Sequence, residues 1–543
     1  MQPSKTSIAA LALTLSCIGR AAADGGIQHE HGSPAGRLGQ VHFATSCASS
    51  VQQEFDHGVA LLHSFWFSAA IESFNTVLKT DPRCVMAHWG IAMSWWGNPF
   101  AGFRSPQALA AGLAATDAAK ASGAGTDREK AYVGAVDLLF RGAPTVDQRT
   151  RTVAYERAME ALAAKYSDDV EARIFYALAL DQTALPTDKT YANQLKAAGI
   201  LEAEFKRQPE HPGLAHYIIH SFDVPALAPR ALDAARRYGK IAPDAAHALH
   251  MPSHTFTRVG AWDESIAANL ASAAAARKDG ATAEELHALD YQTYAYLQTA
   301  QDAAAKRTLD AIVGLRPKMQ TMGAGNAAPP PAGYYALAAI PARYALERDA
   351  WAEAAALQIH ETPFAYADAV THFARALGAA RTGKAAAARA DIVRLIALRD
   401  TLRKANDGYW ADQVDIQQRT ATAWTTLAEG RSDEALTLMR EAAAMEDATE
   451  KAAVTPGPIK PARELLGEML LQLKRPVEAL AEFEATMSKE PNRFRAIYGA
   501  ARAAEAAGER QKASALDARV VEISKNADQP LRKEVAELRR SVR

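Results

Sequence analysis

The sequence contains little that would suit it to bind nucleic acid or an anionic membrane. Its 61 basic residues are balanced by 62 acidic ones, so the net charge is −1. Both kinds of partner usually bind to a basic face of a protein, so we expect neither as the main partner. Beyond the N-terminus there is no apolar run of the roughly 20 residues that cross a bilayer, so we also expect no transmembrane helix.

The motifs of common catalytic sites are missing as well. The chain has no P-loop, no dinucleotide-binding fingerprint, no G-x-S-x-G and no H-E-x-x-H. Cysteine is scarce, with three residues in 543, and aromatic residues make up only 7%. Nothing therefore supports hydrolysis through a nucleophilic triad.

The first 23 residues have the pattern of a cleaved export signal. Lys5 supplies the positive charge, residues 8–18 form a short apolar run, and residues 21–23 form an A-x-A cleavage site. We therefore predict a periplasmic or secreted protein. Anchoring as a lipoprotein through Cys17 is less favoured, because Thr14 occupies a position where that signal prefers an aliphatic residue.

Cys47 and Cys84 are the cysteines that remain after such cleavage. An even number in an oxidising compartment predicts a disulfide, which would tie the N-terminal segment to the end of the first repeat. Two buried free thiols are the alternative.

Helical repeats dominate the chain from residue 51 onward. Glycine, alanine, an aromatic residue and proline recur at positions 8, 20, 24 and 32 of a 34-residue unit, which is the tetratricopeptide (TPR) pattern. Small residues let the two helices of a unit approach, the aromatic ring fills the space between them, and proline ends the second helix. The two clearest matches are Gly58, Ala70, Phe74 and Pro82, and Gly467, Ala479, Phe483 and Pro491. We predict an all-α fold, an α-solenoid of TPR-type helix–turn–helix repeats.

Breaks in the helical pattern divide the chain. Proline- and glycine-rich stretches at 321–333 and 455–461 interrupt the repeats. The predicted parts are a flexible arm (24–50), an N-terminal array (51–320), a middle array (334–452), and C-terminal repeats that end in a capping helix (460–543).

Two histidine pairs lie one repeat apart. His216 and His220 fall at positions 5 and 9 of a unit that starts at Pro212, and His250 and His254 take the same positions 34 residues later. Residues four apart share one helix face, and these positions face the concave groove of TPR arrays. We therefore expect three or four imidazoles to meet around one transition-metal ion, of which zinc, copper, iron and nickel suit imidazole ligands.

Further residues extend this predicted site. His247 precedes the second pair, and Asp223 is expected either as an oxygen ligand or as the acceptor that fixes a histidine tautomer. Pro252 lies inside the second pair, so that the helix either kinks there or begins at Pro252 with His250 outside it. Four more residues are candidates for the ligand groove: Arg258, His287, Tyr291 and His63.

The chain resembles bacterial exported TPR proteins, and in particular a subgroup with a histidine-rich block. The segments that carry this resemblance are residues 45–47, 62–66, 216–220 and 247–254. The resemblance implies a fold and an exported location but no reaction.

Three hypotheses about function remain open at this point. The first is a solenoid that binds a peptide, a protein or a small ligand in its groove beside a histidine-bound metal. The second is a metal-dependent enzyme, hydrolytic or oxidative, that uses the same histidines. The third is a metal-free scaffold with a polar groove.

Overall fold

The computed structural model describes residues 36–102, 104–319 and 327–541, where helices are the only regular elements. The predicted signal peptide, residues 1–23, lies outside this part. No helix in the described ranges is both long and apolar enough to cross a membrane. The all-α prediction is confirmed.

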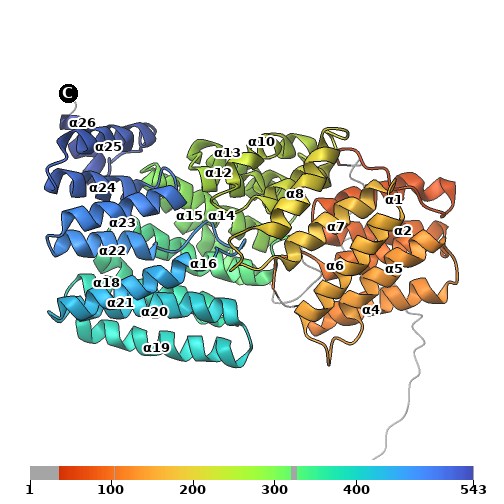
Figure 1. The fold of residues 1–543 in the computed structure, drawn as a ribbon, viewed down its shortest axis with the longest axis horizontal. Coiled ribbons are helices and arrows are strands. Elements are labelled where there is room, and N and C mark those ends of the chain that lie inside the picture. The colour runs from red at the N-terminus through yellow and green to blue at the C-terminus, as the bar shows by residue number, and fades with distance from the viewer. Residues whose placement is uncertain (1–35, 103, 320–326, 542–543) are drawn as a thin grey trace, which may run out of the picture. The chain divides into compact units, whose positions relative to one another are not determined.

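Helices of the N-terminal array follow one another along the chain in antiparallel pairs (Figure 1). They are α1 (Gln52–His63), α2 (Phe67–Thr80), α3 (Val85–Trp96), α4 (Pro106–Ala121), α5 (Asp127–Phe140), α6 (Gln148–Lys165), α7 (Val170–Thr183), α8 (Ala192–Phe205), α9 (Pro212–Ser221), α10 (Leu232–Ile241), α11 (Ala246–His250), α12 (Pro252–Val259), α13 (Trp262–Lys278), α14 (Thr282–Gln298) and α15 (Asp302–Ala311). Short 3-10 helices cover Ser49–Val51, Ala228–Ala231, Ile312–Gly314 and Arg316–Lys318.

The middle and C-terminal arrays continue in the same way. Their helices are α16 (Pro330–Leu346), α17 (Trp351–Ala355), α18 (Ala365–Arg381), α19 (Ala385–Lys404), α20 (Gly408–Ala428), α21 (Ser432–Asp447), α22 (Ala462–Gln472), α23 (Pro476–Lys489), α24 (Phe494–Ala506), α25 (Arg510–Ile523) and α26 (Lys533–Ser541). Each helix packs mainly on its neighbours in sequence, as expected of a solenoid.

Glycine and phenylalanine form the joints of the repeats, and the TPR pattern predicted both phenylalanines and one glycine of each joint. The ring of Phe74 on α2 is fully buried and lies against Gly58 on α1 and Gly90 on α3. Phe483 on α23 lies in the same way between Gly467 on α22 and Gly499 on α24. One aromatic ring thus fills the space that two glycines leave open on the flanking helices.

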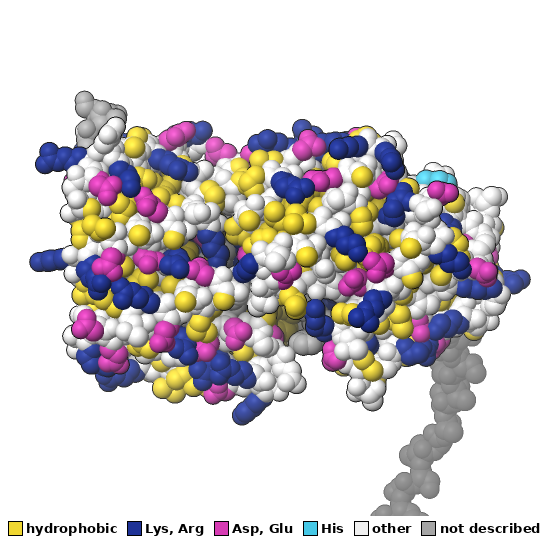
Figure 2. Space-filling model, in the orientation of Figure 1, with side chains coloured by type: hydrophobic (Ala, Val, Ile, Leu, Met, Phe, Trp, Pro, Cys, Tyr) yellow, Lys and Arg dark blue, Asp and Glu magenta, His cyan; other side chains and the backbone are white. Residues whose placement is uncertain are grey.

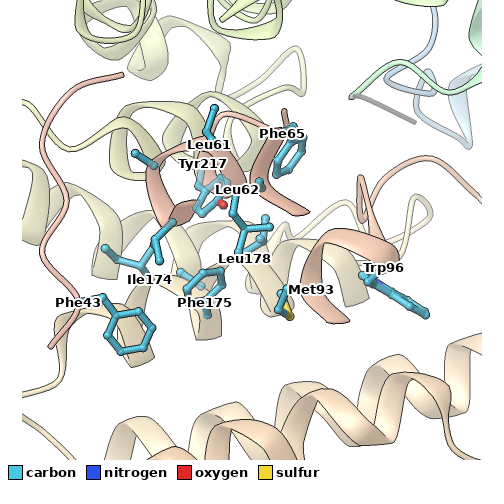
Figure 3. Close-up of a cluster of buried hydrophobic side chains, with 14 of the residues drawn as sticks. Phe43, Leu61, Leu62, Phe65, Met93, Trp96, Ile174, Phe175, Leu178 and Tyr217 are labelled. Carbon is cyan, nitrogen blue, oxygen red and sulfur yellow. The ribbon is translucent and has the colours of Figure 1, made fainter. Parts of the chain in front are cut away.

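Within the expected arm, residues 37–50 lie along the first helices. Phe43 is buried and contacts the rings of Phe55, Trp89 and Tyr132. Cys47 and Cys84 form a disulfide with an S–S distance of 2.07 Å. Figure 3 shows Phe43 at one side of the apolar core and Phe65 and Tyr217 at another. This core supports the histidines described below.

The C-terminal array also contacts the N-terminal one. The Trp262 indole nitrogen donates to the carbonyl of Asn492 (2.8 Å), and Arg493 donates to the hydroxyl of Tyr294 (2.9 Å). Chain segments about 200 residues apart therefore meet around α13 and α14. On the face shown in Figure 2, basic and acidic side chains are interspersed, in line with the balanced composition.

We predict that replacing Gly90 by alanine destabilises the fold. An added Cβ would lie 2.4 Å from the Phe74 ring, so ring or helix must move. The expected loss is about 1–3 kcal/mol of unfolding free energy, measured by chemical denaturation. Gly134→Ala, at an exposed position of α5, is the matched control, because nothing lies within 4 Å of its added Cβ. The control should gain slightly in unfolding free energy. Equal losses of unfolding free energy in both variants would contradict this account of the joint.

A second prediction concerns Glu284 in the first turn of α14. Burial raises the pKa of its carboxyl to about 7, although the Ala328 amide donates to it (2.8 Å). The folded state therefore favours the protonated form, and the stability this provides is lost as pH rises from about 4.5 through 7. Glu284→Gln should therefore stabilise the protein little at pH 5 and by up to about 3 kcal/mol at pH 8.

Chemical denaturation at both pH values measures this difference. Glu72→Gln on the exposed face of α2 is the control and should show the same small effect at both. A gain for Glu284→Gln that does not grow with pH would show that the carboxyl is charged in the folded protein.

Candidate metal-binding site

Six histidines come together as two groups of three. Site A consists of His216, His220 and His247, and site B consists of His250, His254 and His287. Within each group the ligand atoms lie within 4.8 Å of one another. Site A is built from α9 and α11, and site B from α11, α12 and α14. All six side chains are buried except His220, which is partly exposed.

In site B, hydrogen bonds fix which ring nitrogens carry protons. Asn269 donates its amide N–H to the carbonyl of Ser265 (2.8 Å), so its Oδ1 must accept from His250 Nδ1 (2.7 Å). His254 Nδ1 donates to the Asp223 carboxylate (2.9 Å). Each neutral ring has only one N–H, so both Nε2 atoms carry lone pairs. These two Nε2 atoms lie 3.1 Å apart.

Site A repeats this arrangement in part. His216 Nδ1 donates to the backbone carbonyl of His63 (2.7 Å), which leaves a lone pair on His216 Nε2. That atom lies 3.0 Å from His247 Nε2 and 3.1 Å from His220 Nε2. An N–H of His220 or of His247 can satisfy this lone pair, so site A is less constrained than site B; Nδ1 of His247 is buried without a partner in either case.

The spacing of these nitrogens suits coordination of a metal ion. With bonds of about 2.1 Å, nitrogens 3.0–3.1 Å apart subtend about 90–100° at a shared ion. A regular tetrahedral site needs about 3.4 Å, which is a shift of a few tenths of an ångström. The residues thus fit a metal ion, whereas two lone pairs facing each other across 3.1 Å repel.

The surroundings keep the six rings neutral, the form that binds metal. Burial lowers the pKa of His216 and of His287 to about 3. It also lowers the pKa values of His220, His247 and His250 well below 6.5. Burial lowers the pKa of His254 as well, although the nearby Asp223 opposes the shift.

Asp223 connects site B to two cations. Arg258 Nε donates to its Oδ1 (2.9 Å), and Lys451 Nζ donates to its Oδ2 (3.1 Å), the oxygen that also accepts from His254. Although burial raises the pKa of Asp223, Lys451 and Arg258 hold it well below its ordinary range. Burial in turn lowers the pKa of Lys451 to about 8. Asp223 therefore orients His254 as a charged carboxylate.

The segment that joins α21 to α22, residues 448–461, covers site B; we call it the covering segment. The Tyr291 hydroxyl lies 3.1 Å from the Ala453 carbonyl and 3.0 Å from that of Thr455. Arg343 on α16 donates to the carbonyls of Gly457 and Pro458, both at 2.9 Å. The sequence placed the histidines on an open groove, but this segment buries them.

A third group, His63, Glu171 and His211, is a hydrogen-bonded network. The two carboxylate oxygens of Glu171 each accept from an imidazole Nε2 at 3.0 Å, and the Tyr217 hydroxyl lies 3.0 Å from His63 Nδ1. Although burial raises the pKa of Glu171, the two imidazoles hold it below its ordinary value. Both Nε2 protons of this group have an acceptor on Glu171. We therefore assign the group a supporting role, which is to hold the His63 carbonyl that accepts from His216.

The predicted metal ligands are divided between sites A and B. The pairs 216/220 and 250/254 each stay together, but their ligand atoms fall into two separate groups of three instead of one group. His247 joins the first pair, and His287, which is off the repeat register, joins the second. Asp223 accepts a hydrogen bond from His254, which is the second of the two roles expected for it.

The remaining candidates take supporting positions. Arg258 binds Asp223, Tyr291 stacks on His254 at 4.9 Å, and His63 lies outside both sites. The helix breaks between α11 and α12, so His250 precedes Pro252 and ends α11. Met251 keeps helical angles, and the pair therefore still faces one site.

Sequence reasoning missed Asn269 and Lys451. Asn269 lies on α13, where a buried amide has no distinguishing pattern. Lys451 lies 228 residues from its partner Asp223, in a stretch that the sequence marked only as a break between arrays.

No family model and no curated protein matches the sequence. Among solved structures, the human IFIT1 dimer with m7Gppp-AAAA is 11% identical over 82% of this chain and 90% of that chain, with a TM-score of 0.36. The TPR domain of P58(IPK) is 16% identical over 69% of this chain and 98% of that chain, with a TM-score of 0.20. At these identities and TM-scores neither likeness supports a conclusion about this chain.

We predict that Arg343 secures the covering segment. Its guanidinium, fully buried, also pairs with the buried Asp290 (2.9 Å). Arg343→Met would leave this carboxylate unpaired, at an expected loss of about 3–5 kcal/mol of unfolding free energy. Hydrogen exchange of residues 449–460 should become faster in the same variant, because their carbonyls lose a donor.

The matched control is Arg348→Met, two residues after the end of α16. Arg348 pairs with the exposed Glu353, and such pairs contribute less than about 1 kcal/mol. Unchanged exchange in residues 449–460 of the Arg343 variant would contradict the role assigned to that residue.

Proposed function

We propose that this protein binds transition-metal ions through the imidazoles of sites A and B. The observation that carries the proposal is the pair of facing lone pairs on His250 and His254. Both rings donate through Nδ1 to fixed acceptors, so neither can donate to the other. A cation between them turns this repulsion into two bonds.

The ligand type narrows the choice of metal. Sites made of imidazole nitrogens suit zinc, copper, nickel and iron, and they suit magnesium or calcium poorly. Three protein ligands per ion leave at least one coordination position for water or another small ligand, as in catalytic zinc sites. This leaves metal-dependent catalysis, hydrolytic or oxidative, as the alternative to simple binding.

We further propose a small molecule as the ligand, in preference to a peptide. The rings are covered, and a cavity of about 50 Å³ is lined by Arg258 and Lys451, which bind Asp223, and by Tyr409 and Trp410. Export to an oxidising compartment is part of the proposal, and the disulfide between Cys47 and Cys84 is compatible with it.

Metal stoichiometry tests the proposal. Protein stripped with a chelator and dialysed against zinc or copper should retain two ions per chain by elemental analysis. His254→Ala and His220→Ala should each lose one ion, because each removes a ligand from a different site. Each ion should also raise the thermal midpoint, since it binds only the folded state.

His372→Ala is the matched control, because His372 is a buried ring hydrogen-bonded to Asp391 and far along the chain from both sites. It should keep two ions. Retention of less than one ion by the unmodified protein, or equal losses in the control, would refute metal binding at these histidines.

A further inference from the structure

Sites A and B are in direct contact with each other. The ring centroids of His247 and His250 lie 6.1 Å apart, and those of His220 and His254 lie 6.3 Å apart. Distances within one site are similar, for example 5.1 Å between His250 and His254. Two ions held here would therefore be neighbours without any intervening layer of protein.

The charge of such a pair of ions is not balanced by the ligands. All six ligands are neutral imidazoles, so two divalent ions would bring four positive charges into a buried region. Asp223, which contacts site B, is already paired with Arg258 and Lys451, and these three side chains together carry one positive charge. Unbalanced buried charge is costly, and an anion is needed close to the ions.

The residues around the sites are mostly aromatic and do not supply that anion. Phe100 stacks on His220 (4.1 Å), Phe65 on His247 (5.4 Å) and Tyr238 on His216 (5.1 Å). Each ion has an open coordination position, since each site provides three ligands. His220 is the one ligand that is partly exposed, which gives a small solvent-derived molecule a route to this position.

Resting on the proposed metal binding, we propose that the two sites form one dinuclear centre in which a hydroxide ion bridges the metals. Bound water supplies the hydroxide and releases its proton to solvent, a step that metal ions promote by lowering the pKa of the water they bind. The bridge bonds to both ions and reduces the buried charge by one. Ions in such centres lie about 3.5–4 Å apart.

Copper(II) is the probe that distinguishes a shared centre from two separate sites. Copper(II) ions joined by a single oxygen pair their unpaired electrons and lose their EPR signal, whereas isolated copper(II) ions keep it. Protein loaded with two copper(II) ions should show a fivefold or greater loss of detectable spin per copper, by an order-of-magnitude expectation for ions about 4 Å apart. His220→Ala and His254→Ala, each with one copper, should regain full signal.

A copper(I)-specific chelator applied to the denatured protein checks the oxidation state, because copper(I) is also silent. Two copper(II) ions with full signal would overturn the dinuclear centre but leave metal binding intact. Silent copper recovered as copper(I) would overturn it as well. Failure to retain copper at all would instead refute the proposed function. An unchanged circular dichroism spectrum would show that this failure does not come from misfolding.

Discussion

The Asp223 carboxylate is the point at which three parts of the chain meet. It follows α9, accepts from His254 of α12, and binds Lys451 from the covering segment. Arg258, one turn after His254, takes its other oxygen. The orientation of site B therefore depends on contacts between residues of the N-terminal array and a segment more than 200 residues away.

Burial of these groups costs free energy, and it also favours the neutral form of the imidazoles. Removing charged and polar groups from water is unfavourable unless each finds a partner, and the network around Asp223 provides one for each of its cations. The same burial holds the imidazoles neutral, so they present lone pairs instead of competing charges. What remains without a hydrogen-bond donor at site B is a pair of nitrogens, Nε2 of His250 and Nε2 of His254, whose lone pairs face each other across 3.1 Å. Such atoms are rare in folded proteins, and that is why they point to a ligand.

The repeat pattern predicted the fold because the joints are local. Phe74 and Phe483 lie against Gly58 and Gly467, the glycines that the register assigned to them, although the second glycine of each joint, Gly90 or Gly499, was not predicted. It also predicted the two i, i+4 histidine pairs, since residues four apart on a helix must share a face. The third ligand of each site could not be derived in this way. His247 lies near the start of α11, and His287 occupies a helix whose register had drifted from the repeat, so their directions depend on local geometry.

The division into two sites follows from the dimensions of helix packing. Neighbouring helices lie about 8–10 Å apart, whereas four nitrogens around one ion must lie within about 3.4 Å of one another. A pair on one helix can recruit one ring from the next helix, but it cannot bring a whole second pair within that distance. His216 and His220 recruit His247, and the next pair recruits His287. Histidine pairs repeated along a solenoid should therefore form a row of adjacent three-histidine sites, and the number of ions should follow the number of pairs.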